Sequence, residues 1–239
     1  MRKKISVCIA TYNGEKYIKE QLNSILTQLK KDDEIIISDD GSTDKTVEII
    51  KTYVDPRMKF FLNTNGKGPI KNFENAIGKA VGDFIFLSDQ DDLWNNTKVE
   101  EILTAFSSDE DLTMIFSNAD IIDEDGVSKG YSFFKDNNAN DKSIIKSFFK
   151  NQFLGCTIAF KSELRSKILP FPSKIPMHDW WIGILNLHYG KVLFLNKNLI
   201  SYRRHNNNVT SESSSNLSKI VSWRNTLFWL FLKRILKNS

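Results

Sequence analysis

The sequence lacks most of the features that mark secreted and membrane-spanning proteins. Among its 239 residues there are two cysteines, Cys8 and Cys156, too few for a disulfide framework. Cys8 lies within an apolar run, so we expect a buried, reduced thiol. The apolar run after the basic residues 1–4 is too short for a signal peptide, and no stretch approaches the roughly 20 apolar residues of a spanning helix. We therefore expect a cytoplasmic protein, and peripheral contact with the inner face of the cell membrane stays open.

The sequence also carries little net charge. The formal value is +4, the basic residues form no continuous block, and no nucleic-acid-binding module is recognisable, so we expect no nucleic-acid partner. Hydrophobic residues make up 41% and charged residues 26%, which is typical of a globular protein and excludes disorder of the whole chain. The length fits one large domain, alone or with an appendage.

Apolar runs alternate with helical patterns in the first half of the chain. The expected strands cover residues 5–10, 34–38, 59–62, 84–87 and 113–117. The expected helices cover residues 17–29, 44–53, 70–80 and 98–106. This alternation predicts an α/β fold with a mainly parallel, Rossmann-like sheet flanked by helices. Ligands of such sheets bind at the carboxyl ends of the strands.

The second half predicts a mixed region followed by a separate terminal helix. It comprises a hairpin around the Asp-Gly pair at 125–126, strands at 154–160 and 192–195, and short helices at 162–168 and 179–188. Residues 206–218 are rich in Asn and Ser and predict a loop. Residues 217–236 predict an amphipathic helix. It either packs on the domain or lies on an anionic membrane, with Trp223 and Trp229 at headgroup level.

Three carboxylates follow the apolar strand at 84–87. Asp89, Asp91 and Asp92 lie in the run Leu-Ser-Asp-Gln-Asp-Asp-Leu-Trp. An Asp-x-Asp (DXD) motif at the rim of a sheet offers oxygen ligands that a divalent cation and phosphate oxygens can share. A departing nucleoside diphosphate carries charge that such a cation neutralises, and Mn2+ or Mg2+ suits these ligands. His205 is a candidate for a further ligand.

Two other strand ends carry candidate binding residues. Thr11-Tyr12-Asn13-Gly14 closes the first strand, where an aromatic ring can stack on a base. In Asp39-Asp40-Gly41-Ser42 a carboxylate can accept bonds from a pyrimidine or a ribose. Lys67 and Lys71, in a Gly-rich segment, are within reach of phosphates. Each of these motifs alone is also compatible with an ordinary turn.

His178-Asp179-Trp180-Trp181 follows a proline-bounded loop. An Asp at a helix start is a common N-cap, but it can also take a proton from an attacking hydroxyl. The neighbouring tryptophans favour a sugar-binding role, because aromatic faces pack well against sugar rings.

The ordered motifs resemble the family-two inverting glycosyltransferases of the GT-A fold. The resemblance covers nearly the whole chain through His205 and rests on residues 7–14, 38–44, 87–94, 155–157 and 178–181. The Asp-Gln-Asp-Asp-Leu-Trp and His-Asp-Trp-Trp forms, with the Tyr-Arg-x-His-x-x-Asn run from 202, are similar to bacterial rhamnosyltransferase-type members that build surface polysaccharide. The resemblance implies a GT-A domain at 1–205, with a nucleotide-sugar-binding half at 1–118 and an acceptor-binding half at 119–205. Residues 206–239 then form a loop and the amphipathic helix.

The resemblance and the motifs together assign roles. Asp179 is expected to be the catalytic base, with His178, Trp180 and Trp181 on the acceptor side. Asp91 and His205 are expected to bind the metal. The residues expected at the nucleotide-sugar are Thr11, Tyr12, Asn13, Asp40, Lys71, Asp89 and Gln90. The family often has Glu-Asp where this chain has His178-Asp179.

The implied reaction is a metal-assisted single displacement with inversion. The sugar passes from a nucleotide-sugar, dTDP-rhamnose or a UDP-sugar, to a hydroxyl of a growing surface glycan or lipid-linked acceptor. Alternatives are a metal-dependent sugar nucleotidyltransferase, a receiver-like regulatory domain and a nucleotide-sugar-binding protein without turnover. The nucleotidyltransferase is disfavoured because residues 11–16 make a poor phosphate loop.

Overall fold

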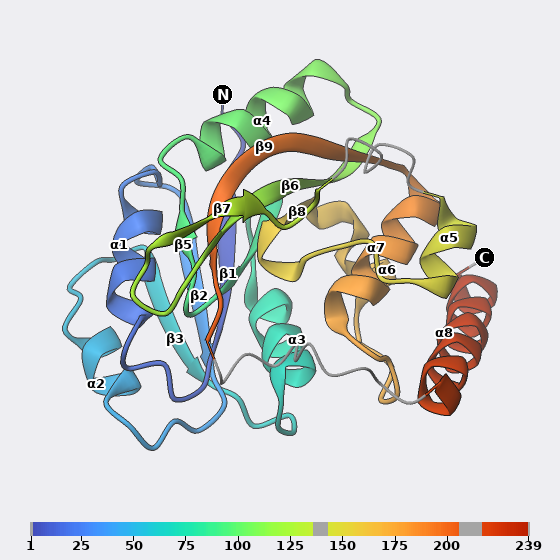
Figure 1. Ribbon diagram of the computed structural model, residues 1–239, viewed down its shortest axis with the longest axis horizontal. Coiled ribbons are helices and arrows are strands. Elements are labelled where there is room, and N and C mark those ends of the chain that lie inside the picture. The colour runs from blue at the N-terminus through green and yellow to red at the C-terminus, as the bar shows by residue number, and fades with distance from the viewer. Residues whose placement is uncertain (1, 136–142, 206–216, 239) are drawn as a thin grey trace.

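The computed structural model describes residues 2–135, 143–205 and 217–238, and its central feature is one twisted sheet covered on both faces (Figure 1). The first strands are β1 (Ile5–Thr11), β2 (Glu34–Asp39), β3 (Met58–Leu62) and β4 (Phe84–Asp89). They are connected through α1 (Ile18–Leu26), α2 (Thr46–Lys51) and α3 (Pro69–Lys79). All six residues of β2 are buried, as expected for a strand covered on both faces.

The rest of the chain adds further strands and helices. The strands are β5 (Leu93–Trp94), β6 (Leu112–Ile122), β7 (Ser128–Ser132), β8 (Ile158–Lys161) and β9 (Lys191–Arg203). The helices are α4 (Lys98–Ser108), α5 (Ile144–Phe149), α6 (Arg165–Ile168), α7 (His178–Tyr189) and α8 (Leu217–Asn238), with 3-10 turns η2 (Gly155–Thr157) and η3 (Ser162–Leu164). Within the described residues, no helix is both long enough and apolar enough to cross a bilayer.

Strand pairing places the ends of β1, β2 and β4 at one rim. The sheet order is β3-β2-β1-β4-β8-β6-β9-β5, and β7 pairs with β6. Strands β1 to β4 pair in parallel, whereas β8 runs antiparallel between β4 and β6. In the register, Thr11 lies opposite Asp39, and Ala10 lies opposite Asp89. The polar residues that follow these strands therefore meet at one edge.

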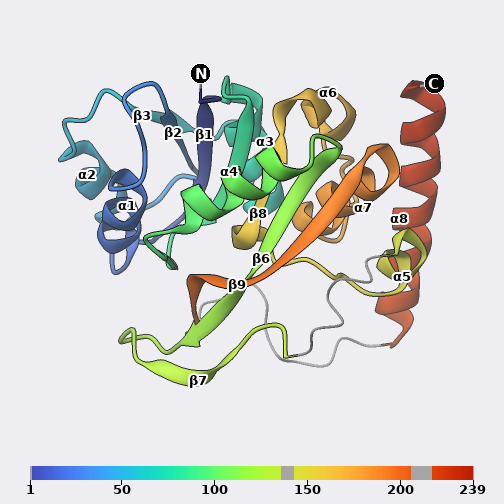
Figure 2. The same ribbon diagram turned by 90° about the horizontal axis from the view of Figure 1, so that it is seen from above.

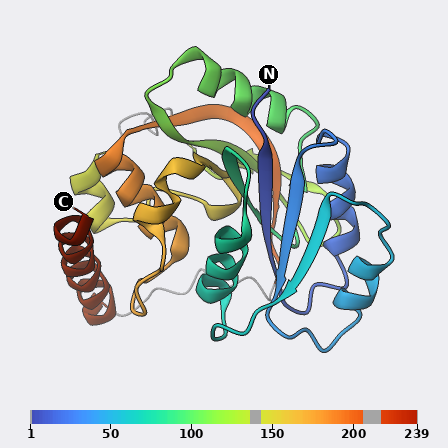
Figure 3. The ribbon, with the colours of Figure 1, turned by 180° about the vertical axis from the view of Figure 1, so that it is seen from behind.

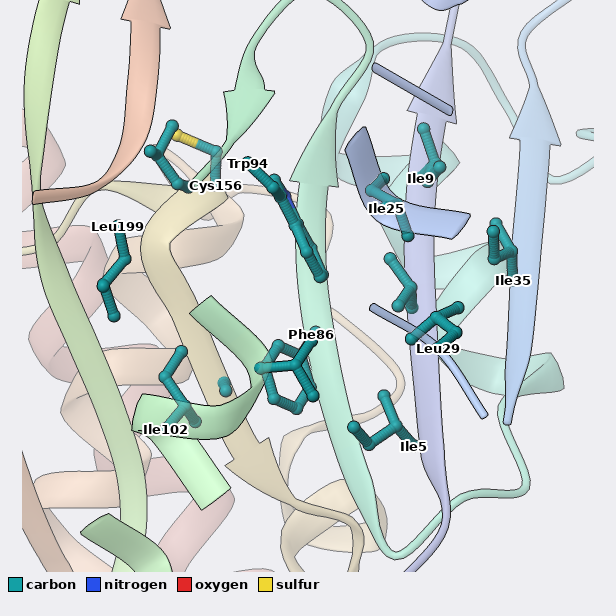
Figure 4. Packing of buried hydrophobic residues seen from close by; sticks show 14 of the residues in the cluster. Ile5, Ile9, Ile25, Leu29, Ile35, Phe86, Trp94, Ile102, Cys156 and Leu199 are labelled. Atoms are coloured by element: carbon teal, nitrogen blue, oxygen red, sulfur yellow. The ribbon is translucent and has the colours of Figure 1, made fainter. Parts of the chain in front are cut away.

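Two apolar clusters, one on each face, hold the sheet. One packs α1 and α4 against the sheet, with Phe86 and Trp94 at 5.8 Å between ring centroids (Figure 4). The other packs α3 and α7 against the opposite face, as seen from behind in Figure 3, and α8 adds Leu227 and Phe231 to this cluster from outside. Cys8 and Cys156 are buried and unpaired, which confirms the expected reduced thiol at Cys8.

The expected strand-helix order and the expected hairpin are confirmed, and some strand bounds differ. The hairpin forms with Gly126 at φ +85°, a left-handed conformation that glycine adopts without strain. The strand expected at 154–160 begins only at Ile158, because Thr157 N–H and its hydroxyl both bond to the Leu154 carbonyl in a 3-10 turn. The short strand expected at 192–195 extends over the whole of β9. The loop expected at 206–218 lies, for residues 206–216, outside the described residues.

Candidate active site

The turn after β1 is fixed to the DXD loop through Gln90. Its side-chain oxygen accepts a bond from Tyr12 N–H at 2.9 Å, and its amide donates to the Tyr12 carbonyl at 2.9 Å. A Cβ at Gly14 would lie 2.2 Å from that oxygen, so glycine makes room for the amide. The Tyr12 ring is 52% exposed above this turn and is free to stack on a planar ligand. Gln90 therefore positions a candidate base-stacking residue.

Thr11 and Asp39 form the buried support of the same rim. Asp39 accepts bonds from the hydroxyls of Thr11 and Ser42, at 2.9 and 2.6 Å. Thr11 is 1% exposed, so its side chain supports the rim, and its expected contact with a nucleoside stays a prediction. Asn13, at φ +47°, accepts a bond from Thr43 N–H and links the turns after β1 and β2.

Asp40 and Lys71, which we expected at the nucleotide-sugar, already interact with other groups of the protein. Asp40 is 8% exposed and accepts bonds from the Asn63 side chain at 2.9 Å and from Gly68 N–H at 2.6 Å. Asp40 thereby holds the loop that leads into α3. The Lys71 ammonium forms an ion pair with Glu74 at 2.6 Å, so the structure places it beside a carboxylate at the start of α3.

The DXD loop meets the end of β9, more than a hundred residues later. His205 Nε2 lies 2.7 Å from Asp91 Oδ2, so the structure brings together the two expected metal ligands. Arg203 is 2% exposed; its Nε donates to the Asp91 carbonyl and its backbone N–H donates to Asp92 Oδ1. Sequence reasoning missed Arg203 as the anchor of this loop.

A buried cation lies beneath the loop. Lys98 is 0% exposed, donates to the Cys156 carbonyl at 2.8 Å, and places its ammonium 4.1 Å from the centre of the Trp94 ring. Burial lowers the pKa of Lys98 to about 7, while burial and the charge of Asp91 raise the pKa of Asp92 to about 7. One oxygen of Asp92 has no hydrogen-bond partner. Lys98 and Asp92, neither of which we had assigned a role, thus partly compensate each other.

Removing the charge of Lys98 or of Asp92 alone should lower the free energy of unfolding. Removing both charges should restore part of that loss. Lys98→Met leaves Asp92 buried without its cation, whereas Lys98→Met combined with Asp92→Asn leaves neither charge. We expect an interaction free energy of about 0.5–3 kcal/mol between the two positions, measured by urea unfolding of the four proteins of the cycle. Lys31→Met, at an exposed lysine, serves as the control. Strictly additive losses would show that the two charges do not interact.

Asp179 has the surroundings of a general base. One of its oxygens accepts a bond from Asn151 at 3.0 Å and the other from Trp180 N–H at 2.6 Å, which fixes the carboxylate. Burial raises the pKa of Asp179 to about 6. The charge of Asp179 also acts on the DXD loop: burial, Asp92, Asp91 and Asp179 together raise the pKa of Asp89 well above its usual range. A carboxylate of this kind can take a proton near neutral pH.

Comparison with known families decides the class of this protein. The family model described as Glycosyl transferase family 2 matches residues 6–166. The chain belongs to this family. The resemblance drawn from the motifs is thus confirmed, and the protein is classed as a glycosyltransferase that uses a nucleotide-sugar.

Two curated relatives of this glycosyltransferase have specific names. The GalNAc(5)-diNAcBac-PP-undecaprenol beta-1,3-glucosyltransferase of Campylobacter jejuni is 31% identical over 244 residues, covering 99% of this chain and 75% of the relative. The dTDP-rhamnosyl transferase RfbG of Shigella flexneri is 31% identical over 218 residues, covering 84% of this chain and 72% of the relative.

Solved glycosyltransferase structures share the fold. Residues 1–349 of TarS from S. aureus, in complex with UDP-GlcNAc, match with a TM-score of 0.74 at 20% identity, covering 94% of this chain and 65% of that chain. The mannosyltransferase PcManGT of Pyrobaculum calidifontis, in complex with GDP-Man and Mn2+, gives 0.65 at 19% identity, covering 84% and 57%. The present chain thus spans less than two thirds of the length of these solved chains. The expected GT-A fold is confirmed.

The tryptophans of this glycosyltransferase do not present faces to a sugar. Trp181 is 0% exposed and donates to the Ile168 carbonyl at 3.1 Å, and Trp180 is 7% exposed and donates to the Ser147 carbonyl. Helix α7 is apolar around most of its circumference and buries both rings, so neither ring is open for stacking on a sugar, and their expected place on the acceptor side stays a prediction. His178 is also buried and stacks on Phe73 at 4.2 Å, and burial lowers its pKa to about 3.

The side chains at the DXD loop and His205 offer ligand atoms that suit a hard divalent cation. Asp91 and His205 offer oxygen and nitrogen at one point, 2.7 Å apart. The described residues also include one group of three potential ligands within 4.8 Å, namely Asp89, Asp92 and Cys156. Burial raises the pKa of the Cys156 thiol, which makes it a poor ligand for Mg2+ or Mn2+. The first set therefore fits better.

Proposed function

We propose that this protein is an inverting glycosyltransferase in which Asp179 is the catalytic base. The observation that carries the proposal is one buried carboxylate, held by Asn151 and the Trp180 N–H, with a pKa of about 6 and a charge that acts on Asp89 of the DXD loop. An inverting displacement needs a base on the side of the attacking hydroxyl and a site for the leaving diphosphate on the other side.

Separate residues then bind the donor and accept the proton of the acceptor. Tyr12 stacks on the base of the donor, and Gln90 holds Tyr12 in place. Asp179 takes the proton of the acceptor hydroxyl as its oxygen attacks the anomeric carbon, and Asn151 keeps the carboxylate aimed. The bond to the nucleoside diphosphate breaks as the new glycosidic bond forms, so the configuration inverts.

Asp91 and His205 are the proposed ligands of Mn2+ or Mg2+ in this site, with Asp89 at the nucleotide-sugar. When bound, the cation supplies charge that stabilises the departing diphosphate. The Arg203 contacts to Asp91 and Asp92 hold these ligands in place before the cation arrives. We further propose that residues 1–118 serve the donor and 119–205 the acceptor, within the one continuous sheet.

The proposed donor is dTDP-rhamnose or a UDP-sugar, and the proposed acceptor is a hydroxyl of a lipid-linked or growing surface glycan. Relatives named a dTDP-rhamnosyl transferase and an undecaprenol-linked glucosyltransferase support these classes. Such an acceptor would place the reaction at the inner face of the cell membrane.

Calorimetric titration of UDP, dTDP and GDP, each with manganese and with chelator, tests the proposal. We expect one pyrimidine diphosphate to bind only in the presence of manganese. Uracil and thymine present the same hydrogen-bonding edge, so the motifs cannot distinguish UDP from dTDP. The titration makes that distinction. Absence of metal-dependent binding for all three nucleotides would contradict the donor-site assignment.

A further inference from the structure

Helices α5 and α8 form one outer surface at the side of the molecule farthest from β3 (Figures 1 and 2). Phe148 of α5 contacts Phe228 and Phe231 of α8, with ring centroids 5.5 and 5.3 Å apart. The Arg224 guanidinium of α8 lies 5.8 Å from the centre of the Phe149 ring. The two helices therefore act as one packed unit with a common outer face.

That outer face exposes large apolar side chains. The exposed fractions are 67% for Ile145, 59% for Phe149, 44% for Phe228 and 62% for Trp229. Phe228 and Trp229 lie 6.1 Å apart, so these rings adjoin. Burying such side chains is favourable, and apolar groups gathered in this way mark an interaction site.

The charged residues of α5 and α8 themselves, with Lys150, are all basic. Lys146 and Lys150 are exposed beside Ile145 and Phe149, and α8 contains lysines and arginines but no Asp or Glu. Lysines and arginines flanking exposed aromatic rings match the surface of an anionic bilayer, where the rings enter the headgroup layer and the cations meet lipid phosphates.

The same surface is joined to the proposed base. Asn151, two residues beyond α5, donates the 3.0 Å bond to Asp179, and Ser147 of α5 accepts the bond from Trp180. A membrane bound at α5 and α8 would therefore lie on the acceptor side of the molecule. We propose that the outer face of α5 and α8, the α5–α8 surface, docks on anionic phospholipid membrane. Its use in presenting a lipid-linked acceptor rests on the proposed function, but the docking does not.

Vesicle co-sedimentation of the 239-residue chain tests the docking. We expect partitioning onto phosphatidylglycerol-containing vesicles that falls as salt rises, and little binding to phosphatidylcholine vesicles. Phe149→Ser with Trp229→Ser should lower the partition coefficient at least about tenfold, as should Lys146→Glu with Lys150→Glu. The control is Val54→Ser, at a fully exposed apolar residue in the loop after α2.

The outcomes separate docking from its alternatives. Equal binding to both vesicle types, or unchanged binding of both double variants, would overturn the proposal. A dimer in light scattering that the Phe149 and Trp229 substitutions dissociate, without vesicle binding, would assign the surface to self-association instead. Unchanged nucleotide titrations in the variants verify that they fold. Failure of those titrations in the wild type would count against the donor site alone.

Discussion

Asp179→Asn is expected to lower the rate of sugar transfer by at least roughly a hundredfold, the usual contribution of a general base. The amide keeps the size of the carboxylate and can still accept the bond from Trp180 N–H, but it cannot take the acceptor proton. Donor binding should survive, because Asp179 is assigned no contact with the nucleotide. The measurement is turnover at saturating donor, together with a donor titration of the same variant.

The pH dependence of the wild type gives an independent check of Asp179. Burial raises its pKa to about 6, and the base acts when it is deprotonated. At saturating manganese, kcat/KM should therefore rise with pH through about 6 and level off above it. Burial disfavours the charged form, so the ionisation of Asp179 adds no stability at neutral pH. Full turnover of Asp179→Asn, with exposed Asp111→Asn as the matched control, would refute the assignment.

Asp91→Ala is expected to weaken manganese-dependent binding of the nucleoside diphosphate by roughly ten- to a hundredfold or more, since it removes a ligand rather than a supporting group. His205 Nε2 would lose its partner at 2.7 Å, and the Arg203 contact to the backbone would remain. The loop should therefore keep its position while the cation loses an oxygen. Titration of the nucleotide over a range of manganese concentrations measures the effect.

The comparison variant for Asp91 is Asp32→Ala, at an exposed carboxylate before β2, at the opposite end of that strand from the rim. It changes the net charge equally and should leave the titration unchanged. If both variants bind the nucleotide like the wild type, with and without chelator, Asp91 is not a metal ligand.

The rim of the sheet was predictable from the sequence, because strands that end in polar residues place them at one edge. The register of Thr11 with Asp39 and of Ala10 with Asp89 follows from that pattern. The proximity of His205 to Asp91 was expected only through the family resemblance, since no local periodicity links residues 114 positions apart.

The buried supports could not be read from the sequence in the same way. Lys98 is the first residue of α4 and resembles an ordinary exposed lysine until tertiary packing places Trp94 and Cys156 against it. Asn151 lies in an irregular segment, and its role is visible only from its hydrogen bond to Asp179 in the folded structure. The position of Trp180 and Trp181 beside Asp179 suggested contact with a sugar, but α7 turns both rings into the core. The strong apolar character of that helix was the signal that favoured burial.

The contacts of Arg203 also constrain how the enzyme matures. This residue closes onto Glu20 and Asp92 across 183 and 111 positions of the chain, and β9 inserts between β6 and β5 to bring it there. Contacts of such long range form late and slowly, after much of the entropy of the chain has been lost. A nascent polypeptide that has completed β1 to β4 would hold these strands without the Arg203 contacts to its acidic loop. The proposed cation site would therefore be complete only when β9 has been synthesised and has paired with β6.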